Sequence, residues 1–240
     1  IAALRGEPYE HAVNLPFLEQ KLNKAQKAFL QLSRKMGVLG AKLAEVECGA
    51  VYGCHIMLRG DLFCEEEPIP SRLCAYSIAV LKGLFEVSRG PEVSYMLAPL
   101  LAKDSGLAVE EGFAEARTYK NTIELTLDAE KCSVSLIGTI TEEGRMRIVK
   151  VNDYWLDFVP GGKLILFQNH DRPGVIGKIG NILGESKINI ANFALGRKDN
   201  SGLALGALEV DNDIDETTRK KLEKSGDMLW LALIDLTETE

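Results

Sequence analysis

The chain lacks the motifs on which most catalytic and membrane-spanning proteins depend. Its 240 residues include only three histidines, and no pattern indicates a Ser–His–Asp or Cys–His pair. No GxGxxG turn follows a strand and opens a helix, as a Rossmann dinucleotide site requires. Gly174, Gly177 and Gly180 recur every third residue but lack the first tight glycine pair. We therefore expect neither catalytic residues nor a dinucleotide site in this chain.

Cysteine is scarce as well, and its spacing does not favour a metal centre. The five cysteines form no CxxC pair, and one is left over in any disulfide scheme. Cys54-His55 is the only adjacent cysteine–histidine pair, which is too little for a zinc or iron–sulfur site. We interpret the cysteines as buried reduced thiols and expect no metal. They lie at positions 48, 54, 64, 74 and 132.

Long apolar runs and one-sided charge are also missing. No stretch of about 18 apolar residues could span a membrane, and the start has no signal-peptide pattern. The net charge of −7 comes from interspersed acidic and basic residues, which argues against a nucleic-acid or anionic-membrane partner. We expect a soluble, intracellular protein, cytoplasmic or in a plastid, and 46% hydrophobic residues suffice for one or two cores.

The first two thirds of the chain predict a mixed α/β domain. Residues 1–6 resemble the last turn of a helix and begin without methionine, so we expect the C-terminal part of something longer. Ser71 is placed to cap one of the later helices. The periodicity predicts helices over 17–45, 71–87 and 98–103, and strands over 51–59, 122–128, 132–141, 145–151 and 154–159.

The last third, after the linker Pro160-Gly161-Gly162, predicts a ferredoxin-like unit. Its pattern is βαββαβ, which forms a four-stranded antiparallel sheet with two helices on one face. The overall fold class is therefore α+β. The predicted elements are strand 163–169, helix 174–186, strands 188–196 and 203–210, helix 215–225 and strand 228–236.

The segment Asn169 to Val175 is the most informative loop of the chain. A loop between a strand and a helix directs backbone N–H groups at one spot, which suits the carboxylate of a small amino acid. Pro173 fits the first helical turn, and Asp171 is placed to cap the helix or to accept from a ligand ammonium. Asn189 opens the next strand. We expect Asn169, Asp171 and Asn189 to converge on one edge of the sheet, where two copies could enclose a ligand.

The glycines at 174, 177 and 180 leave one face of the predicted helix bare. A strand, a partner helix or a ligand could then approach closely. Ordinary packing of the helix on its own sheet explains the spacing equally well.

These residues carry a family resemblance. Asn169-x-Asp171-Arg-Pro-Gly-Val-Ile-Gly followed by Asn189-Ile190, inside βαββαβ, resembles an ACT domain, the amino-acid-sensing module of many biosynthetic enzymes. The upstream segments resemble, in order, the long form of D-3-phosphoglycerate dehydrogenase. Those segments are Arg5-Gly6-Glu7, Ala12-Val13-Asn14-Leu15-Pro16, residues 98–106, Gly138-Thr139 and Arg147-Ile148-Val149.

The resemblance implies a domain order. Residues 1–16 would be a catalytic-domain helix and connector, 17–160 an intervening (allosteric substrate-binding) domain, and 163–240 the ACT domain. The family's catalytic residues and NAD belong to catalytic domains that these 240 residues do not contain. Ser94 to Leu97 depart from the family, which often carries asparagines there.

The resemblance also implies partners and sites. Asn169, Asp171 and Asn189, with backbone near Val175, match the family's serine-contacting positions, so L-serine would bind between paired ACT domains of a homodimer or higher oligomer. An anion site in the intervening domain would use Arg145, Arg147 and Lys150. Arg145 and Arg147 share a strand face by the two-residue period, while Lys150 is expected on the other.

Two other readings stay open. The regulatory half of an iron–sulfur L-serine dehydratase has a similar pair of domains, but it would need cysteines spaced for a cluster. A purely structural role would use both domains only as contacts between subunits.

Overall fold

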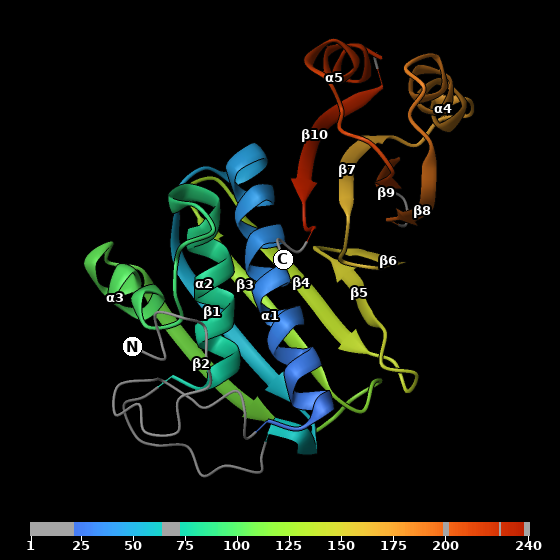
Figure 1. The fold of residues 1–240 in the computed structure, drawn as a ribbon. Helices are drawn as coiled ribbons and strands as arrows, with labels where there is room; N and C mark the ends of the chain where they lie inside the picture. The colour runs from blue at the N-terminus through green and yellow to red at the C-terminus, as the bar shows by residue number, and fades with distance from the viewer. Residues whose placement is uncertain (1–21, 64–72, 199–201, 226, 238–240) are drawn as a thin grey trace, which may run out of the picture.

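The computed structural model describes residues 22–63, 73–198, 202–225 and 227–237, and they form two α+β domains (Figure 1). Each domain is a sheet with helices on one face, so the predicted fold class is confirmed. Among the described residues, no helix is long and apolar enough to cross a membrane. Residues 1–16, Phe17, Ser71 and Cys64 lie outside the described residues.

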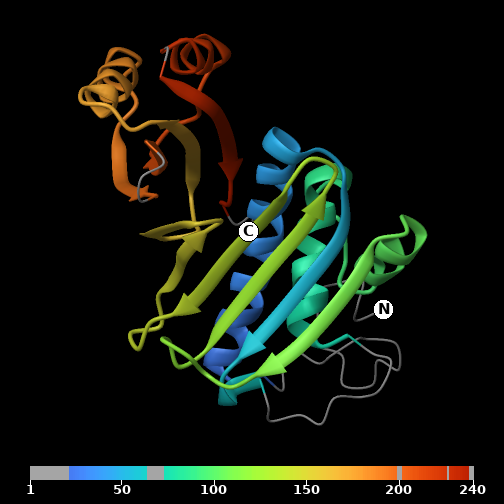
Figure 2. The same cartoon turned by 180° about the vertical axis from the view of Figure 1, so that it is seen from behind.

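The first domain is a six-stranded sheet covered on one face by two long helices. The strand order is β2-β1-β3-β4-β5-β6, with β1 and β2 parallel and the other neighbours antiparallel. Figure 2 shows the face opposite the helices. The elements are α1 (Lys24–Leu43), η3 (Ala44–Cys48), β1 (Val51–Arg59), η4 (Asp61–Phe63), α2 (Ala75–Arg89), α3 (Leu97–Asp104), β2 (Ala108–Ala114), β3 (Thr122–Ala129), β4 (Ser133–Ile140), β5 (Met146–Val151) and β6 (Tyr154–Phe158).

Helix α1 is started by a capping box and held against α2 by glycines. Asn23 Oδ1 accepts from the backbone N–H of Gln26 at 2.9 Å, and the Gln26 side chain accepts in return from Asn23 N–H at 2.9 Å. A Cβ on Gly37 would lie 2.1 Å from the carbonyl oxygen of Val80 in α2. A Cβ on Gly83 in α2 would lie 1.9 Å from a carbonyl oxygen of α1. The two helices therefore cross with their backbones nearly in contact.

The expectation of reduced thiols is wrong for two of the cysteines. Cys48, at the end of η3, forms a disulfide with Cys132 in the turn between β3 and β4. The turn is already held there, because the backbone N–H of Lys131 donates to the carbonyl of Cys48 at 2.9 Å. The pairing brings together residues 84 positions apart, which spacing alone does not reveal. Cys54 and Cys74 are free thiols, and burial raises the pKa of Cys54 to about 12.

The second domain has the predicted βαββαβ order. Its antiparallel sheet has the strand order β10-β7-β9-β8, with α4 and α5 on one face. Between sheet and helices lies a core that includes Phe167, Ile179, Leu183 and Leu222. The elements are β7 (Lys163–His170), α4 (Val175–Glu185), β8 (Ile190–Arg197), β9 (Leu203–Val210), α5 (Glu216–Glu223) and β10 (Met228–Asp235).

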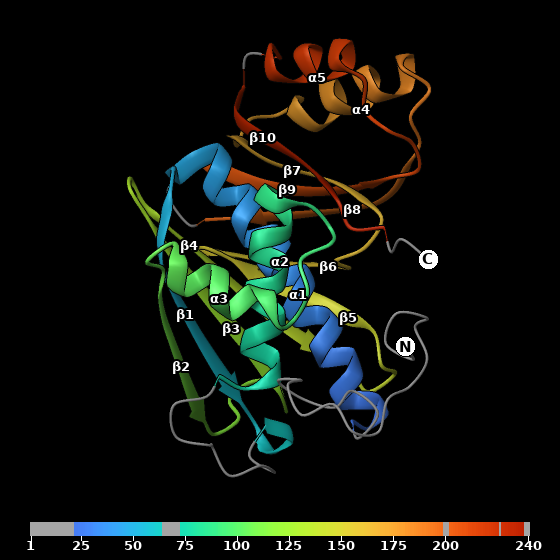
Figure 3. The same ribbon diagram turned by 60° about the vertical axis from the view of Figure 1, so that its left-hand side comes forward.

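The helix-free face of the second sheet lies on the first domain, as Figure 3 shows. Leu164, Leu166 and Leu205 from this face belong to the same continuous apolar cluster as the core of the first domain. A Cβ on Gly196 of β8 would lie 2.8 Å from the carbonyl oxygen of Trp155 in β6. The domains are therefore joined by shared apolar burial as well as by the linker.

Polar contacts add to this junction. The Gln168 side-chain amide donates to the Tyr154 hydroxyl at 3.0 Å. The ammonium of Lys198, just after β8, pairs with Asp153 in the turn between β5 and β6 at 2.6 Å. The end of β8 is thus fixed to the first domain on both sides of Arg197.

Candidate functional site

The 169–175 loop leaves the sheet at a buried asparagine. Asn169 is the penultimate residue of β7 and is only 2% exposed. Its Nδ2 donates to the carbonyl of His170 at 2.7 Å, while its Oδ1 is buried and has no hydrogen-bond partner. An unpaired buried amide oxygen costs free energy of about 1 to 3 kcal/mol. A bound donor at this loop would remove that cost.

Asp171 does not cap helix α4, contrary to the sequence prediction. Its carboxylate Oδ2 lies 3.0 Å from Nε of Arg197, at the end of β8, and its backbone N–H donates to Gly202 at 2.8 Å. Helix α4 instead begins at Val175 with Gly174 as its N-cap, at a φ of 91°, and without a side-chain cap. Pro173 therefore precedes the helix rather than forming its first turn. The Asp171 carboxylate is left facing a cation.

Asp227 holds the other side of the loop. Its backbone carbonyl accepts from the N–H of His170 at 2.8 Å, and its carboxylate pairs with Lys178 of α4 at 2.8 Å. A second cation, Arg172, lies 3.8 Å from this carboxylate. The hydrogen bond from Lys178 lowers the pKa of the Asp227 carboxyl, so it is ionised at neutral pH. Nothing in the sequence pattern singles out this residue, which precedes β10.

Asn189 does not converge with Asn169 and Asp171 in one copy of the chain, so that expectation is wrong. In the sheet register, Asn169 pairs with Ala204 of β9, whereas Ile190 pairs with Val210 at the other end of β9. Six residues of β-strand separate these ends by roughly 20 Å. Asn189 is exposed there, and its amide donates to Asp211 at 2.8 Å.

The bare face of α4 is not used for packing on its own sheet. A Cβ added to Gly177, Gly180 or Gly184 meets no atom within 4 Å. The opposite face carries Val175, Ile179 and Leu183, all buried in the core. Of the interpretations offered by the glycine spacing, the helix–sheet one is therefore excluded, and the face is open to another molecule.

Two of the three proposed anion-site residues, Arg147 and Lys150, share a strand face, but each already has a partner there. Val149 forms a β-bulge in β5 against β4, so Arg147 and Lys150 lie on the same face, contrary to prediction. Arg147 pairs with Asp157 at 2.5 Å, and the Lys150 ammonium lies 5.3 Å from the centre of the Trp155 ring. Arg145 is exposed in the turn before β5. The anion site stays a prediction.

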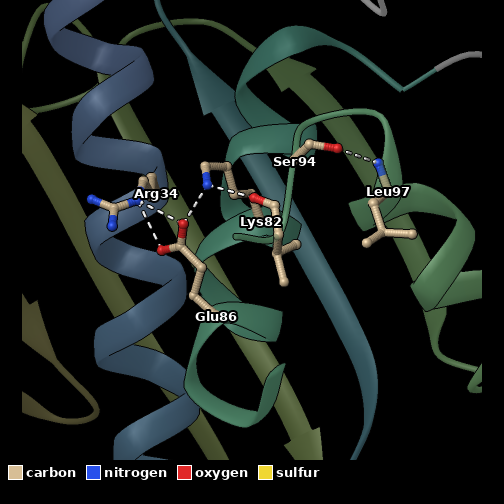
Figure 4. Close-up of polar contacts among 6 residues, drawn as sticks. Arg34, Lys82, Glu86, Ser94 and Leu97 are labelled. Carbon is tan, nitrogen blue, oxygen red and sulfur yellow. Dashed lines mark hydrogen bonds and ion pairs between the residues drawn. The ribbon is translucent and has the colours of Figure 1, made fainter. Parts of the chain in front are cut away.

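A second polar cluster, missed in the sequence, joins α1, α2 and the loop before α3 (Figure 4). The Glu86 carboxylate is nearly buried and accepts from Arg34 Nε at 2.8 and 3.1 Å and from Lys82. Lys82 also donates to the carbonyl of Val93 at 2.5 Å. Ser94 Oγ accepts from the backbone N–H of Leu97 at 3.2 Å, at the start of α3. The cluster is satisfied internally and positions the segment that departs from the family pattern.

The fold and loop define a pair of α+β domains, of which the second is ferredoxin-like. Comparison with known families makes the assignment specific. Residues 25–152 match the D-3-phosphoglycerate dehydrogenase intervening domain, and residues 163–227 match the ACT domain. The chain belongs to the D-3-phosphoglycerate dehydrogenase family.

Individual relatives agree with this assignment. The chain is 29% identical over 233 residues to D-3-phosphoglycerate dehydrogenase of Methanocaldococcus jannaschii, covering 97% of this chain and 43% of that protein. It is 33% identical over 212 residues to that of Archaeoglobus fulgidus, covering 87% and 38%. It is 28% identical over 233 residues to that of Bacillus subtilis, covering 97% of this chain and 43% of that protein. The chain thus spans about two fifths of the length of these relatives.

Proposed function

We propose that this chain is the regulatory region of an NAD-dependent D-3-phosphoglycerate dehydrogenase of L-serine biosynthesis, and that L-serine binds its ACT domains as a feedback effector. The whole enzyme would bind NAD and substrate in catalytic domains that these residues do not include. The family assignment and the 169–175 loop support this proposal. The enzyme would work in the cytoplasm, or in a plastid, as the name of an Arabidopsis thaliana relative indicates for that protein.

The observation that carries the proposal is the placement of the three polar residues at opposite ends of one sheet. Asn169 and Asp171 lie at one end, and Asn189 at the other. In a two-fold dimer whose sheets pair antiparallel along one edge, each end of one sheet meets the opposite end of the other sheet. Two complete sites would form, each with the 169–175 loop of one copy and Asn189 of the second.

Strand β8 provides the edge for such pairing. It is the last strand of the sheet, and edge strands present backbone groups to another chain. If two β8 strands pair antiparallel about a two-fold axis, Ile190 of one copy lies near Arg197 of the other. Because Arg197 contacts Asp171, Asn189 of the second copy would reach the 169–175 loop.

The open face of α4 fits the same arrangement. Helix α4 follows the 169–175 loop, and its glycines let a second helix approach closely. Two α4 helices packed beside an extended sheet would bury this face and exclude water from the loops. Feedback would then arise because the ligand binds the paired state, with a coupling free energy of typically about 1 to 3 kcal/mol.

Each polar group of L-serine has a partner in this arrangement. Its ammonium would donate to the Asp171 carboxylate, and the Asn189 amide could bind the carboxylate or the hydroxyl. The buried Oδ1 of Asn169 would accept a further hydrogen bond. Backbone N–H groups at the start of α4 would favour the carboxylate, since helix N-termini carry partial positive charge.

Isothermal titration of the 240-residue chain with L-serine tests the proposal, with D-serine and glycine as competing ligands. We expect a signal selective for L-serine that weakens about tenfold or more in Asp171→Asn and in Asn189→Ala, since a hydrogen bond to a charged group contributes about 1.5 to 3 kcal/mol. Thr217→Ala, at an exposed polar residue of α5 outside both the 169–175 loop and β8, is the matched control. Unchanged affinity in both site variants would refute the assignment of this loop.

The two alternative functions give different results in the same experiment. A stable dimer that binds no amino acid would indicate a purely oligomerising role. The dehydratase reading predicts a brown protein with visible absorbance from an iron–sulfur cluster. Cys48 and Cys132 are bonded to each other, and no group of three metal-ligating side chains is assembled among the described residues.

A further inference from the structure

We propose that Arg197 determines specificity in the amino-acid site: with Asp171 it forms a paired receptor that binds the α-carboxylate while Asp171 binds the α-ammonium. This inference rests on the proposed function, because it concerns the same site. Arg197 lies outside the set of residues that the family motif identifies. The fold brings Arg197 next to Asp171.

The register of the sheet places Arg197 at the site. Arg197 pairs with Ala204 of β9 from one side, and Asn169 pairs with Ala204 from the other. Both residues therefore lie at the end of the sheet that carries the 169–175 loop. Arg197 Nε lies 3.0 Å from Asp171 Oδ2, although the two residues are far apart in sequence.

The position of Arg197 is fixed by its neighbours on both sides. Gly196 packs directly on β6, where a Cβ would lie 2.8 Å from the carbonyl oxygen of Trp155. Lys198 is paired with Asp153 at 2.6 Å. The backbone at Arg197 is thus held by the first domain, while its side chain is 68% exposed and reaches the loop. A held backbone lowers the entropy cost of presenting the guanidinium to a ligand.

The charge pattern of the pair is complementary to a zwitterion. An α-amino acid carries its ammonium and carboxylate one carbon apart, so its receptor needs an anion and a cation side by side. Asp171 and Arg197 supply them in adjacent positions. The Nε–H of Arg197 is directed at Asp171, and the guanidinium has four other N–H donors in a fork that fits a carboxylate. The ligand ammonium would donate to the Asp171 oxygen that does not contact Arg197.

A rival role for Arg197 predicts the opposite effect. The Arg197 guanidinium could instead pair with Asp171 only while the site is empty. It would then compete with the ligand ammonium, and Arg197→Gln should strengthen L-serine binding. In that case the start of α4 alone would bind the carboxylate. The two roles can be separated with a ligand that keeps the ammonium and lacks the carboxylate charge, such as L-serine methyl ester.

The experiment titrates L-serine and L-serine methyl ester into the 240-residue chain and into Arg197→Gln, Arg197→Lys and Arg219→Gln. Arg219 is the matched control, because its Nε pairs with Glu223 at 2.9 Å on the surface of the same domain. We expect Arg197→Gln to weaken L-serine binding at least tenfold while changing affinity for the ester less than threefold. Arg197→Lys should recover part of the loss, and Arg219→Gln should resemble the unsubstituted chain.

Three results would overturn the inference. Equal loss for L-serine and its ester would show that Arg197 only maintains the loop. Unchanged or increased affinity for L-serine in Arg197→Gln would show that it is a bystander or a competitor. In these cases the unsubstituted chain still binds L-serine, so the proposed function survives. If the unsubstituted chain binds neither ligand, the proposed function fails together with this inference.

Discussion

The helix glycines of the two domains have opposite surroundings. In the intervening domain, Gly37 and Gly83 have no room for a Cβ, because each faces the backbone of the other helix. In the ACT domain, Gly177, Gly180 and Gly184 face open space. The same residue type therefore marks a completed contact in one domain and an unoccupied face in the other.

The polar residues differ in the same way. In the intervening domain, Glu86 is enclosed by Arg34 and Lys82. In the ACT domain, Asn169 has a buried oxygen without a partner, and Asp171 is paired with a largely exposed arginine. The Glu86 cluster is satisfied within its own domain. The ACT domain leaves groups that a ligand and a second copy would complete.

The largest expected effect is loss of the Cys48–Cys132 disulfide. It closes 84 residues of the intervening domain, and a loop of that length stabilises a folded protein by about 4 kcal/mol through the unfolded state. We expect urea unfolding of dithiothreitol-reduced protein to show a loss of that order in the intervening domain. The double variant Cys48→Ala/Cys132→Ala, which has no bridge to reduce, is the control for other effects of the reductant. Equal stability in both states would mean that the bridge adds nothing to the completed domain.

Next in size is Gly83→Ala. The added methyl group would lie 1.9 Å from the Arg34 carbonyl oxygen, so α1 and α2 must separate. Overpacking of this kind costs about 1 to 3 kcal/mol, and we expect the upper end of this range because the methyl group meets backbone. Chemical denaturation should show this loss. A change below about 1 kcal/mol would mean that the helices can move apart freely, and the contrast between the domains would disappear.

Gly180→Ala should act in the opposite direction. Since no atom lies within 4 Å, alanine should stabilise α4 by up to about 1 kcal/mol in the isolated subunit. Two α4 helices in contact would no longer approach as closely, so the dimer should dissociate at higher concentration. Sedimentation equilibrium and thermal unfolding measure the two effects separately. Tighter dimerisation in this variant would exclude α4 as the contact surface.

The smallest effect concerns His55 on the helix-free face of the intervening domain. Its hydrogen bond with Asp128 at 2.8 Å raises the pKa of the imidazole; desolvation opposes the rise, and Glu110 at 3.0 Å adds to it. The stabilisation is complete below the unfolded pKa of about 6.5 and is lost as pH rises through the raised folded value.

Because His55 is substantially exposed, the loss should stay below about 1 kcal/mol. Unfolding measured from about pH 6 to about pH 9 should show this decline, and His55→Gln should flatten it. If the free energy of unfolding of His55→Gln still falls with pH over this range, other titratable groups cause the decline.

The sequence predicted local structure well and long-range register poorly. The βαββαβ order was readable because short apolar runs of strand length, such as the one in β7, are separated by helices such as α4, whose buried residues recur at helical spacing. Strand β2 (Ala108–Ala114) was missed, because it is a partly exposed edge strand that includes Glu110 and Glu111. Its parallel pairing with β1 involves residues far apart in sequence. Periodicity cannot report such a contact.

The errors at the site have the same origin. Asp171 was expected to cap α4, but Arg197, from another strand, takes its carboxylate. Lys150 was placed on the wrong face because a bulge at Val149 reverses the alternation. Asn189 was predicted to lie beside Asp171. The pairing of β8 with β9 places it at the opposite end of the sheet, and the sequence does not show this register. Residue types at the site were predictable, whereas their positions relative to one another required the fold.

Mixing two inactive variants shows whether the amino-acid site is shared between two copies of the chain. Asp171→Asn and Asn189→Ala are each expected to abolish tight L-serine binding in their own dimers. In a refolded equal mixture, half of the dimers contain one of each, and every such dimer has one intact site. If the site is shared, the mixture should recover about a quarter of the unsubstituted binding capacity, at unsubstituted affinity. No recovery, with mixed dimers demonstrably formed, would contradict a shared site.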